Sequence, residues 1–478
     1  MKSGRTNWKK DAKYAWLSFR QMETFIEKDF HTIEEGKGVY VRDDRNVWLL
    51  DGSSLLVNSS FGHSNKHIKE AIYEQMNKLD NMSTYLAANN TTIKCSKKIC
   101  KLTDNHFFSV FFTNSGSEAT DTAIKIIKKY YRNKGVDKKK IVSLKNAYHG
   151  SSLGAMALTQ DSFEGEEDLF PEGFLQITAP DLSDGVSEKS VKQGVRECIE
   201  EVEKIVKTNH DIAAIYIELV QLSNGVCVLP KDYVEKLYEI CKKNEILFVV
   251  DEVATGFGRT GEMFASQHYG LWPDIMTVGK GISGGCFPIA GVAVTEEIFN
   301  TFYELGNEGI KLEHGYTASG NPVGCAAILA TIDELEKDGG KIIESCKIMG
   351  KYLLERLEYK RINSNARELI DNIRGKGLMV SVNFKKIRVI FNTKKNQGIA
   401  RMIYRMLRHR GVLIYPDSDY NIIIAPPLII EKEQIDLICE QLFDTLDELF
   451  LLNNSQSITL IDESNILKNG TEEGCDLN

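Results

Sequence analysis

The amino-acid sequence predicts an α/β protein whose larger part is a mainly parallel sheet covered on both faces by helices. Between residues 105 and 330, short apolar or β-branched runs alternate with helical periodicity, which is typical of strand–helix units in a parallel sheet. After about residue 335 the pattern changes to helices with scattered strands. This change predicts a smaller α+β domain at the C-terminal end, joined by the N-terminal 60 residues.

Each expected strand is a short run of β-branched or other apolar residues. In the larger part these runs are Val110–Thr113, Ile141–Leu144, Ala213–Glu218, Leu247–Val250, Ile275–Val278 and Ile289–Val294. Helices are expected where apolar residues recur with a period of about 3.6. These segments are 64–80, 117–131, 190–207, 231–243, 323–337 and 341–359. Strands of the smaller domain are expected at Leu378–Asn383, Val412–Tyr415 and Asn421–Ala425.

The chain length of 478 residues suffices for at least two domains. The expected division is an N-terminal segment shared with the smaller domain (1–60), a large domain (61–335), a small C-terminal domain (336–450) and a polar tail (451–478). The tail is weakly patterned, so its end is expected to be mobile.

Composition excludes several classes of protein. Hydrophobic residues make up 42% and charged residues 26%, as in ordinary globular proteins, and a net charge of −8 argues against nucleic acid or an anionic membrane as partner. The ten cysteines form no CxxC pair, which favours reduced thiols over disulfides or a zinc site, so no metal is expected. The N-terminus lacks an apolar signal segment, and no apolar run approaches the ~20 residues that span a bilayer. The chain is therefore expected to be cytoplasmic.

The stretch "ILFVVDEVATGFGRTG", residues 246–261, is the first chemical signal. An apolar strand delivers the carboxylate of Asp251 at its end and then breaks into a glycine-rich loop. Ligands of parallel sheets bind outside the carboxyl ends of the strands, so this acid is expected to meet a cation there.

Two other strand ends carry complementary groups. The strand ending at Thr113 runs into "NSGSEAT", where small residues open a helix and present free N–H groups to a phosphate. The alternative is that Ser117 with Thr120 simply caps that helix. The strand Ile275–Val278 ends in "GKGISGG", which places Lys280 between glycines, either as a solvated side chain or as a desolvated, nucleophilic amine.

Together these groups match one cofactor. Pyridoxal phosphate (PLP) has an aldehyde that a lysine binds through a Schiff base, a pyridinium that a carboxylate stabilises, and a phosphate that suits a helix start. Asp251 precedes Lys280 by 29 residues, about one strand–loop–helix unit, so their strand ends can be neighbours. Tyr148 and His149 in "KNAYHG" could stack on and hydrogen-bond a flat ligand, or simply pack a loop.

Five ordered motifs carry a resemblance to a known family. "TNSGSEAT", "AYHG", "VVDEVATGFGRTG", "PDIMTVGKGISGGCFPIAGV" and "HGYTASGNPVGCAA" resemble the successive signatures of the class III (fold type I) aminotransferases, including omega-aminotransferases, over roughly residues 15 to 448. The resemblance implies a PLP enzyme with a seven-stranded-type sheet. It also implies a homodimer, with small-molecule amines and oxo acids as substrates.

The resemblance assigns roles by position. Lys280 matches the lysine that carries the cofactor, and Asp251 matches the partner of its pyridine nitrogen. The other residues implied to contact the cofactor are Ser115, Gly116, Ser117, Tyr148, Glu218, Gln221, Val253 and Thr317. Thr317 matches a threonine that reaches the phosphate across the dimer interface, although it could equally cap the next helix. The loop after Glu218 reads "LVQLSNG" where the family often has "PVQG", so its shape is expected to differ.

Substrate selection follows from departures at two arginine positions. Ile423 stands where ornithine-type and 4-aminobutyrate-type members resemble "IRFAPPL", and Tyr415 stands where diaminopelargonate-type members carry an arginine before a proline. A guanidinium is the strongest carboxylate clamp, so its loss predicts a donor whose far end is not a clamped carboxylate. Arg20, Arg259 and Arg374 remain as possible anchors for the oxo acid, although the last two are expected to brace loops.

Four further residues are expected near the substrate. Trp16 and Phe19 belong to an N-terminal segment that resembles the stretch lining the substrate mouth, although they could merely pin the N-terminus. Leu56 and Val57 replace a larger aromatic of many relatives, which could open the pocket to bulkier amines.

The implied reaction is ping-pong transamination from a primary amine to a 2-oxo acid such as pyruvate or 2-oxoglutarate. Alternatives on the same scaffold are an aminomutase, an epimerase, a decarboxylase or a diaminopelargonate-type aminotransferase. A dehydrogenase is disfavoured because no GxGxxG follows the first strand. A non-catalytic subunit is disfavoured because the lysine and aspartate are both present.

Overall fold

A seven-stranded sheet forms the centre of the larger part of the computed structural model, which describes residues 8–163, 165–180, 187–391, 395–456 and 458–462. Its strands are β4 (Ser109–Thr113), β5 (Lys140–Leu144), β6 (Phe174–Ile177), β7 (Ile212–Ile217), β10 (Leu247–Asp251), β11 (Ile275–Val278) and β12 (Ala290–Val294). They lie in the order β4-β12-β11-β10-β7-β5-β6, and only the pairs that include β12 are antiparallel. The predicted mainly parallel sheet is confirmed.

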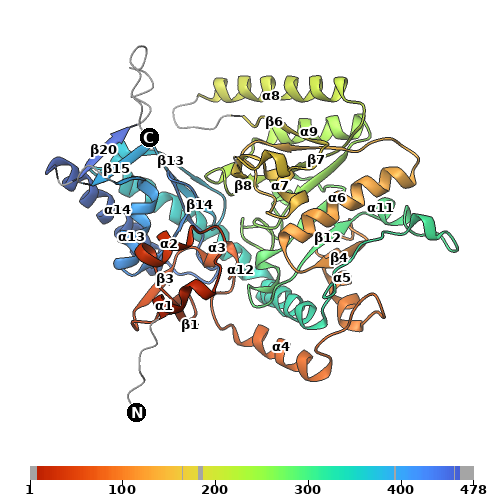
Figure 1. Ribbon diagram of the computed structural model, residues 1–478, viewed down its shortest axis with the longest axis horizontal. Coiled ribbons are helices and arrows are strands. Elements are labelled where there is room, and N and C mark those ends of the chain that lie inside the picture. Colours follow the sequence, from red (N-terminus) through yellow and green to blue (C-terminus); the bar gives the residue numbers. More distant parts are fainter. Residues whose placement is uncertain (1–7, 164, 181–186, 392–394, 457, 463–478) are drawn as a thin grey trace.

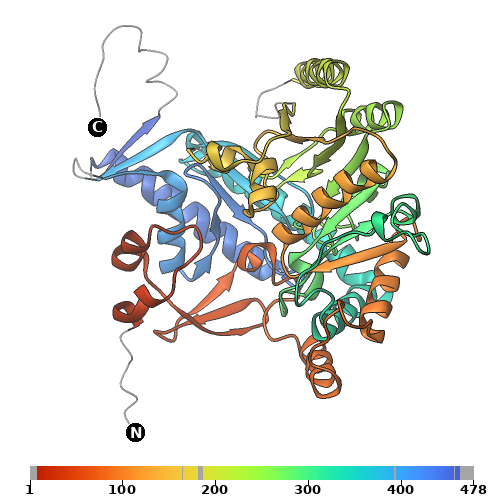
Figure 2. The ribbon, with the colours of Figure 1, turned by 45° about the vertical axis from the view of Figure 1, so that its right-hand side comes forward.

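Helices cover both faces of this sheet (Figures 1 and 2). One face packs against α6 (Gly116–Asn133) and α7 (Leu153–Thr159), and the other against α8 (Glu188–Thr208) and α9 (Lys231–Lys243). Alternate side chains of the central strand β10 serve the two faces: Leu247 and Val249 join one core, and Phe248 and Val250 the other. A strand that is apolar throughout is therefore buried on both sides, and its polar end, Asp251, reaches the edge of the sheet.

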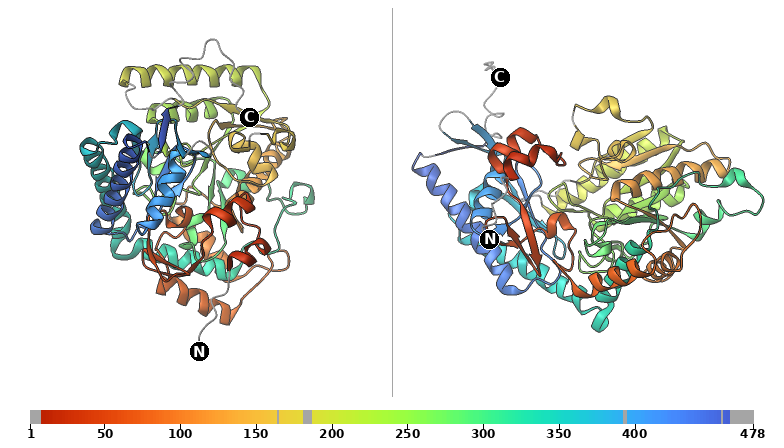
Figure 3. Two further views of the ribbon diagram at one scale, coloured as in Figure 1. Left: turned by 60° about the vertical axis from the view of Figure 1, so that its left-hand side comes forward. Right: turned by 60° about the horizontal axis from the view of Figure 1, so that its bottom comes forward.

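The N- and C-terminal segments lie together beside the larger part, as the red and blue ribbons of Figure 3 show. One sheet joins β1 (Ile33–Lys37), β2 (Tyr40–Asp43) and β3 (Trp48–Asp51) to β17 (Val412–Leu413). A second sheet contains β13 (Ile370–Gly375), β14 (Val380–Phe384), β19 (Asn421–Ile424) and β18 (Tyr415–Pro416). Helices α13 (Ile399–His409) and α14 (Lys432–Asn454) pack there, with α12 (Pro322–Asn363) linking this part to the larger one.

The remaining elements complete the chain. The helices are α1 (Trp8–Asp11), α2 (Met22–Thr24), α3 (Ser54–Val57), α4 (Lys66–Lys78), α5 (Asn90–Lys101), α10 (Ser266–Tyr269) and α11 (Glu296–Asn300). The strands are β8 (Val220–Gln221), β9 (Cys227–Val228), β15 (Ile387–Phe391), β16 (Lys395–Gly398) and β20 (Thr459–Asp462). Within the described residues, no helix has the length and apolar character needed to cross a membrane.

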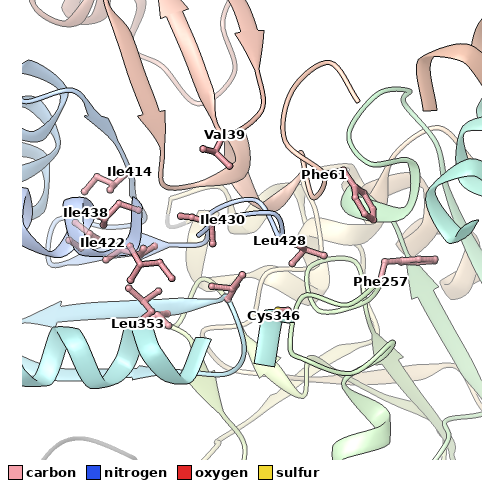
Figure 4. Close-up of a cluster of buried hydrophobic side chains, with 14 of the residues drawn as sticks. Val39, Phe61, Phe257, Cys346, Leu353, Ile414, Ile422, Leu428, Ile430 and Ile438 are labelled. Atoms are coloured by element: carbon pink, nitrogen blue, oxygen red, sulfur yellow. The ribbon is translucent and has the colours of Figure 1, made fainter. Parts of the chain in front are cut away.

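A continuous apolar cluster holds the two parts together (Figure 4). Val39 comes from the N-terminal strands, Ile422 and Ile438 from the C-terminal elements, and Phe257 from the loop that follows β10. Because each of these side chains is at most 4% exposed, the position of the C-terminal segment relative to the sheet is fixed by packing.

The two helices expected at 323–337 and 341–359 are both present, because α12 is interrupted by non-helical backbone at 337–340. Two other features differ from the sequence prediction. The strand expected at Val412–Tyr415 divides into β17 and β18, which belong to different sheets. Part of the expected polar tail, Thr459–Asp462, forms strand β20, which pairs antiparallel with β15. The end of that tail lies outside the described residues.

Candidate active site

The carboxyl ends of three adjacent strands bring the expected chemical groups together. Glu218 follows β7, Asp251 ends β10, and Lys280 comes two residues after β11. All three charges interact: burial lowers the pKa of the Lys280 ammonium, and the charges of Glu218 and Asp251 act in the opposite direction. The prediction that the strand ends carrying Asp251 and Lys280 are neighbours agrees with the strand order.

The two adjacent carboxylates at the end of β10 have different surroundings. Asp251 accepts the Val253 N–H at 3.0 Å through Oδ1, and its Oδ2 lies 2.8 Å from Nδ1 of His149. Glu252 instead accepts hydrogen bonds from the backbone N–H groups of Ala265 and Ser266, so it holds the following loop in place. Asp251 is thus the carboxylate oriented by a histidine at the sheet edge.

Lys280 is a partly buried residue on strained backbone. Burial lowers the pKa of its ammonium, and the surrounding carboxylates oppose that effect only in part. Its φ of +45° lies in the left-handed region, which a non-glycine residue adopts only when its surroundings impose it. Burial and strain together mark an amine held for chemistry rather than for solubility.

The helix start after β4 has the predicted form but a different cap. Ser115 is the N-cap of α6 and accepts the N–H of Glu118 at 3.2 Å. The alternative interpretation that Ser117 caps this helix is wrong, because the Ser117 hydroxyl accepts the N–H of Ser151 at 3.1 Å. Ser117 lies inside the first turn, so the first free N–H groups of α6 remain for an anion.

Val253 connects this helix start to the lysine loop. A Cβ added at Gly116 would lie 3.1 Å from a Val253 methyl group, and one added at Gly279 would lie 3.2 Å from the same methyl. The two glycines therefore keep the space in front of Val253 free of side chains. A flat group that packs on Val253 would lie between the start of α6, where free N–H groups could bind a phosphate, and Lys280.

Two polar side chains at the start of the loop after β7, Glu218 and Gln221, have different surroundings. Glu218 is 4% exposed and accepts the Tyr148 N–H at 3.0 Å. Burial and the nearby Asp251 raise the pKa of Glu218 to about 7. The Gln221 amide has partners at both ends, the Lys145 carbonyl at 3.1 Å and the Asn224 side chain at 3.1 Å, so it braces the loop.

Two of the expected arginines also brace loops. Arg259 is buried and donates to the carbonyl groups of Leu378 and Pro426. Arg374 donates to the carbonyl groups of Asn224 and Gly225. Both guanidinium groups are therefore engaged with backbone rather than directed to a ligand.

Arg20 differs from these two arginines, because its side chain is exposed. Its guanidinium stacks 5.6 Å from the ring centroid of Phe25, and its charge acts on the Tyr415 hydroxyl. Phe19 is 71% exposed with its ring 6.3 Å from Phe163, and Trp16 is 91% exposed.

Leu56 and Val57 lie on one turn of left-handed backbone within α3. Leu56 is 46% exposed, but Val57 is 3% exposed and packs in an apolar cluster with Ile423, Ala425 and, at its edge, Tyr415. Both expected arginine positions therefore adjoin one apolar wall. Thr317 is exposed on the surface of the chain, and its predicted contact with a neighbouring subunit stays a prediction.

Sequence reasoning missed Asp417. Burial and the charge of Glu218 raise the pKa of its carboxyl group to about 7, while the charge of Lys280 acts in the opposite direction. Alternation along "YPDSDY" was the available signal, because it places residue 417 on the same side of the chain as Tyr415.

The residues present fit pyridoxal phosphate. An amine whose pKa is lowered by desolvation, a buried carboxylate one strand away and a glycine-opened helix start supply partners for its aldehyde, pyridine nitrogen and phosphate. The space in front of Val253, which a Cβ at position 116 or 279 would enter, suits a flat ring.

Comparisons with known proteins cover nearly the whole chain. The family model for class-III aminotransferases matches residues 25–446. The chain is 34% identical over 451 residues to adenosylmethionine-8-amino-7-oxononanoate aminotransferase of Anoxybacillus flavithermus, covering 92% of this chain and 96% of that protein. It is 33% identical over 406 residues to acetylornithine aminotransferase of Aquifex aeolicus, covering 84% and 93%. The solved omega transaminase of Pseudomonas jessenii in complex with PMP superimposes with a TM-score of 0.84 at 29% identity, covering 93% and 98%.

Proposed function

The chain belongs to the class III aminotransferases, which are PLP-dependent enzymes, and we propose that it transfers the amino group of a primary amine with no carboxylate clamp at its far end to a 2-oxo acid. The observation that carries the choice of donor is the apolar wall at both family arginine positions. Ile423 is fully buried there, and Tyr415 packs beside the same cluster. A donor carboxylate would meet no guanidinium on this wall.

The residues divide the work of binding the cofactor. Gly116 and Ser117 at the start of α6 would bind the phosphate, while Val253 and Tyr148 would contact the two ring faces. Ser115 would support this seat as the helix cap, and Gln221 through the loop it braces. When bound, pyridoxal phosphate supplies an electron-withdrawing ring that stabilises negative charge on the substrate carbon.

Asp251 and Lys280 perform the proton chemistry. Asp251 would keep a proton on the pyridine nitrogen, and its hydrogen bond with His149 holds the carboxylate in place. Lys280 would hold the aldehyde carbon and, once an amine displaces it, move a proton between the substrate carbon and C4′ of the cofactor. Burial favours the neutral form of the Lys280 amine, which is the form that accepts this proton.

Arg20 is the proposed anchor for the carboxylate of the oxo acid. It is exposed near the substrate end, whereas Arg259 and Arg374 already bind carbonyl groups. Trp16, Phe19 and Leu56 would line the mouth, with Val57 behind them as part of the wall. Exposed aromatic side chains that face an entrance suit an amine with an apolar body.

Thr317 is proposed to reach the cofactor phosphate of a neighbouring subunit in a homodimer. Its exposure, and the exposure of Tyr85 (66%) and Leu86 (83%), support a surface that a second copy covers.

The proposed division into residues 1–60, 61–335, 336–450 and 451–478 is supported by the break in α12 at 338–340. A cytoplasmic location is proposed because the nine described cysteines are all free.

A two-step spectroscopic assay tests the proposed transamination. The holoenzyme is mixed with a primary amine, and absorbance follows conversion of the bound cofactor to its aminated form. Pyruvate and 2-oxoglutarate are then added separately, and at least one should restore the original spectrum while gaining the amino group. Product formation that needs no oxo acid would overturn the proposal in favour of an isomerase or decarboxylase.

A further inference from the structure

We infer that Asp417 binds the far ammonium group of the amine donor, so that the donor is a diamine. The inference rests on the proposed transamination and names the donor class for the same site. Asp417 follows directly after β18, and its N–H donates to the Asn421 carbonyl at 3.1 Å, which fixes the position of the residue beside β19. Its charge acts on Lys280, as the charges of Glu218 and Asp251 do.

The Asp417 carboxylate has an unused hydrogen-bonding atom. Its Oδ2 is buried and lacks a hydrogen-bond partner among the described residues, while Ser223 donates to the carboxylate. A buried carboxylate oxygen without a partner is costly, so a bound ligand, an ion or an ordered water is needed to supply the missing donor. Ser223 belongs to the loop after Glu218, whose sequence differs from the usual family sequence. Asp417 therefore lies where two segments that differ from the family meet, this loop and the segment that contains Tyr415.

The charges around Asp417 are unbalanced. Glu218 and Lys280 are the charged groups that act on it, and Asp251 adds a third carboxylate nearby through its effect on Glu218. Three carboxylates thus surround one amine, and that amine is the group committed to the cofactor. Arg20 acts on Tyr415 and does not relieve this excess at Asp417.

The sign of this charge selects among donors. An ω-amino acid would bring its carboxylate towards Glu218 and Asp417, where like charges repel. A monoamine would bury Asp417 without a partner. A diamine supplies an ammonium group that both neutralises Asp417 and donates to its free Oδ2.

Three donors of equal length isolate the far-end charge: 1,5-diaminopentane, pentylamine and 5-aminopentanoate. Each is assayed with the holoenzyme and a saturating oxo acid, and kcat/KM is compared. The diamine should exceed pentylamine by about 10- to 100-fold, the range expected for one charge-assisted hydrogen bond. The amino acid should be the poorest of the three.

Asp417→Asn tests the residue, with Asp419→Asn as the matched control. Asp419 lies two positions on and pairs with Arg388 at 3.1 Å and Arg401 at 3.4 Å, outside the group of charges around Lys280. Asp417→Asn should lower the diamine-to-pentylamine ratio at least tenfold, mainly through a higher KM for the diamine. Asp419→Asn should keep the wild-type ratio.

The outcomes separate the inference from the proposed function. Equal or better use of pentylamine or 5-aminopentanoate by the wild-type enzyme overturns the diamine seat while leaving transamination intact. An unchanged ratio in Asp417→Asn does the same. Failure of all three donors to aminate any oxo acid, with the cofactor bound, overturns both. The wild-type ratio decides the question even if Asp417→Asn does not fold.

Discussion

Replacing Asp251 by Asn tests the electrostatic core of the site with almost no change in shape. Asn keeps the size of the side chain but removes the negative charge that would hold a proton on the pyridine nitrogen. The carboxylate is 4% exposed and lies 2.8 Å from His149, so water does not screen its charge effectively. The substitution should therefore slow proton transfer far more than it weakens cofactor binding.

The expected magnitude follows from the burial of this charge. Removing one partner of a buried charged pair costs about 3–5 kcal/mol, and each 1.4 kcal/mol changes a rate tenfold. Asp251→Asn should therefore lower the single-turnover rate of cofactor amination by about two to four orders of magnitude. Phosphate binding at the start of α6 should hold the cofactor, with binding weakened by less than the rate.

The assay is stopped-flow absorbance of the holoenzyme mixed with saturating amine, and Glu252→Gln is the matched control. Glu252 is the adjacent buried carboxylate, but its oxygens accept the N–H groups of Ala265 and Ser266. Its replacement should lower the melting temperature and leave the single-turnover rate of the folded enzyme within about threefold. The proposed role of the Asp251 charge is wrong if Asp251→Asn keeps more than about a tenth of the wild-type rate. It is also wrong if Glu252→Gln lowers the rate as much as Asp251→Asn does.

Three other predictions concern the amine, the second acid and a buried arginine. Lys280→Ala should abolish turnover, measured as oxo-acid amination, while equilibrium dialysis still finds bound cofactor; near-normal turnover would contradict its role. The pKa of Asp417 is raised to about 7, so its charge is present above that pH, and the diamine-to-pentylamine ratio of kcat/KM should rise with pH through 7. Glu218 and Lys280 are the charged groups that act on it, and a flat ratio in the wild-type enzyme would contradict the assignment. Arg259→Ala removes hydrogen bonds to two buried carbonyl groups and should lower the free energy of unfolding by roughly 2–5 kcal/mol in urea titrations; a smaller loss would show that this arginine does not brace the loops.

The sheet and the adjacency of Asp251 and Lys280 were predictable because their signals are local. Apolar runs define β10 and β11, and each run is followed at once by an acid or by a lysine between glycines. In a parallel sheet, strand ends meet at one edge, so Asp251 and Lys280 could be placed together without tertiary information. Helix bounds followed from periodicity within a few residues, as α6 and α9 show.

Other features depend on contacts that the linear sequence does not carry. Ser115 rather than Ser117 caps α6 because of the backbone angles at residue 115, which letters alone do not specify. Gln221 matches a family position, yet its amide is taken by Lys145 and Asn224 across the loop. Asp417 lies near Glu218 and Lys280 because β18, which precedes it, pairs with β19. Its carboxylate accepts a hydrogen bond from Ser223 in the loop after β7.

Mass spectrometry after borohydride reduction tests the central claim most directly. The purified protein is incubated with pyridoxal phosphate, reduced, digested and mapped for a covalently attached phosphopyridoxyl group. The account predicts the group on the peptide that contains Lys280, with a large loss of labelling rate in Asp251→Asn. Labelling of a different lysine, or none at all, would contradict it.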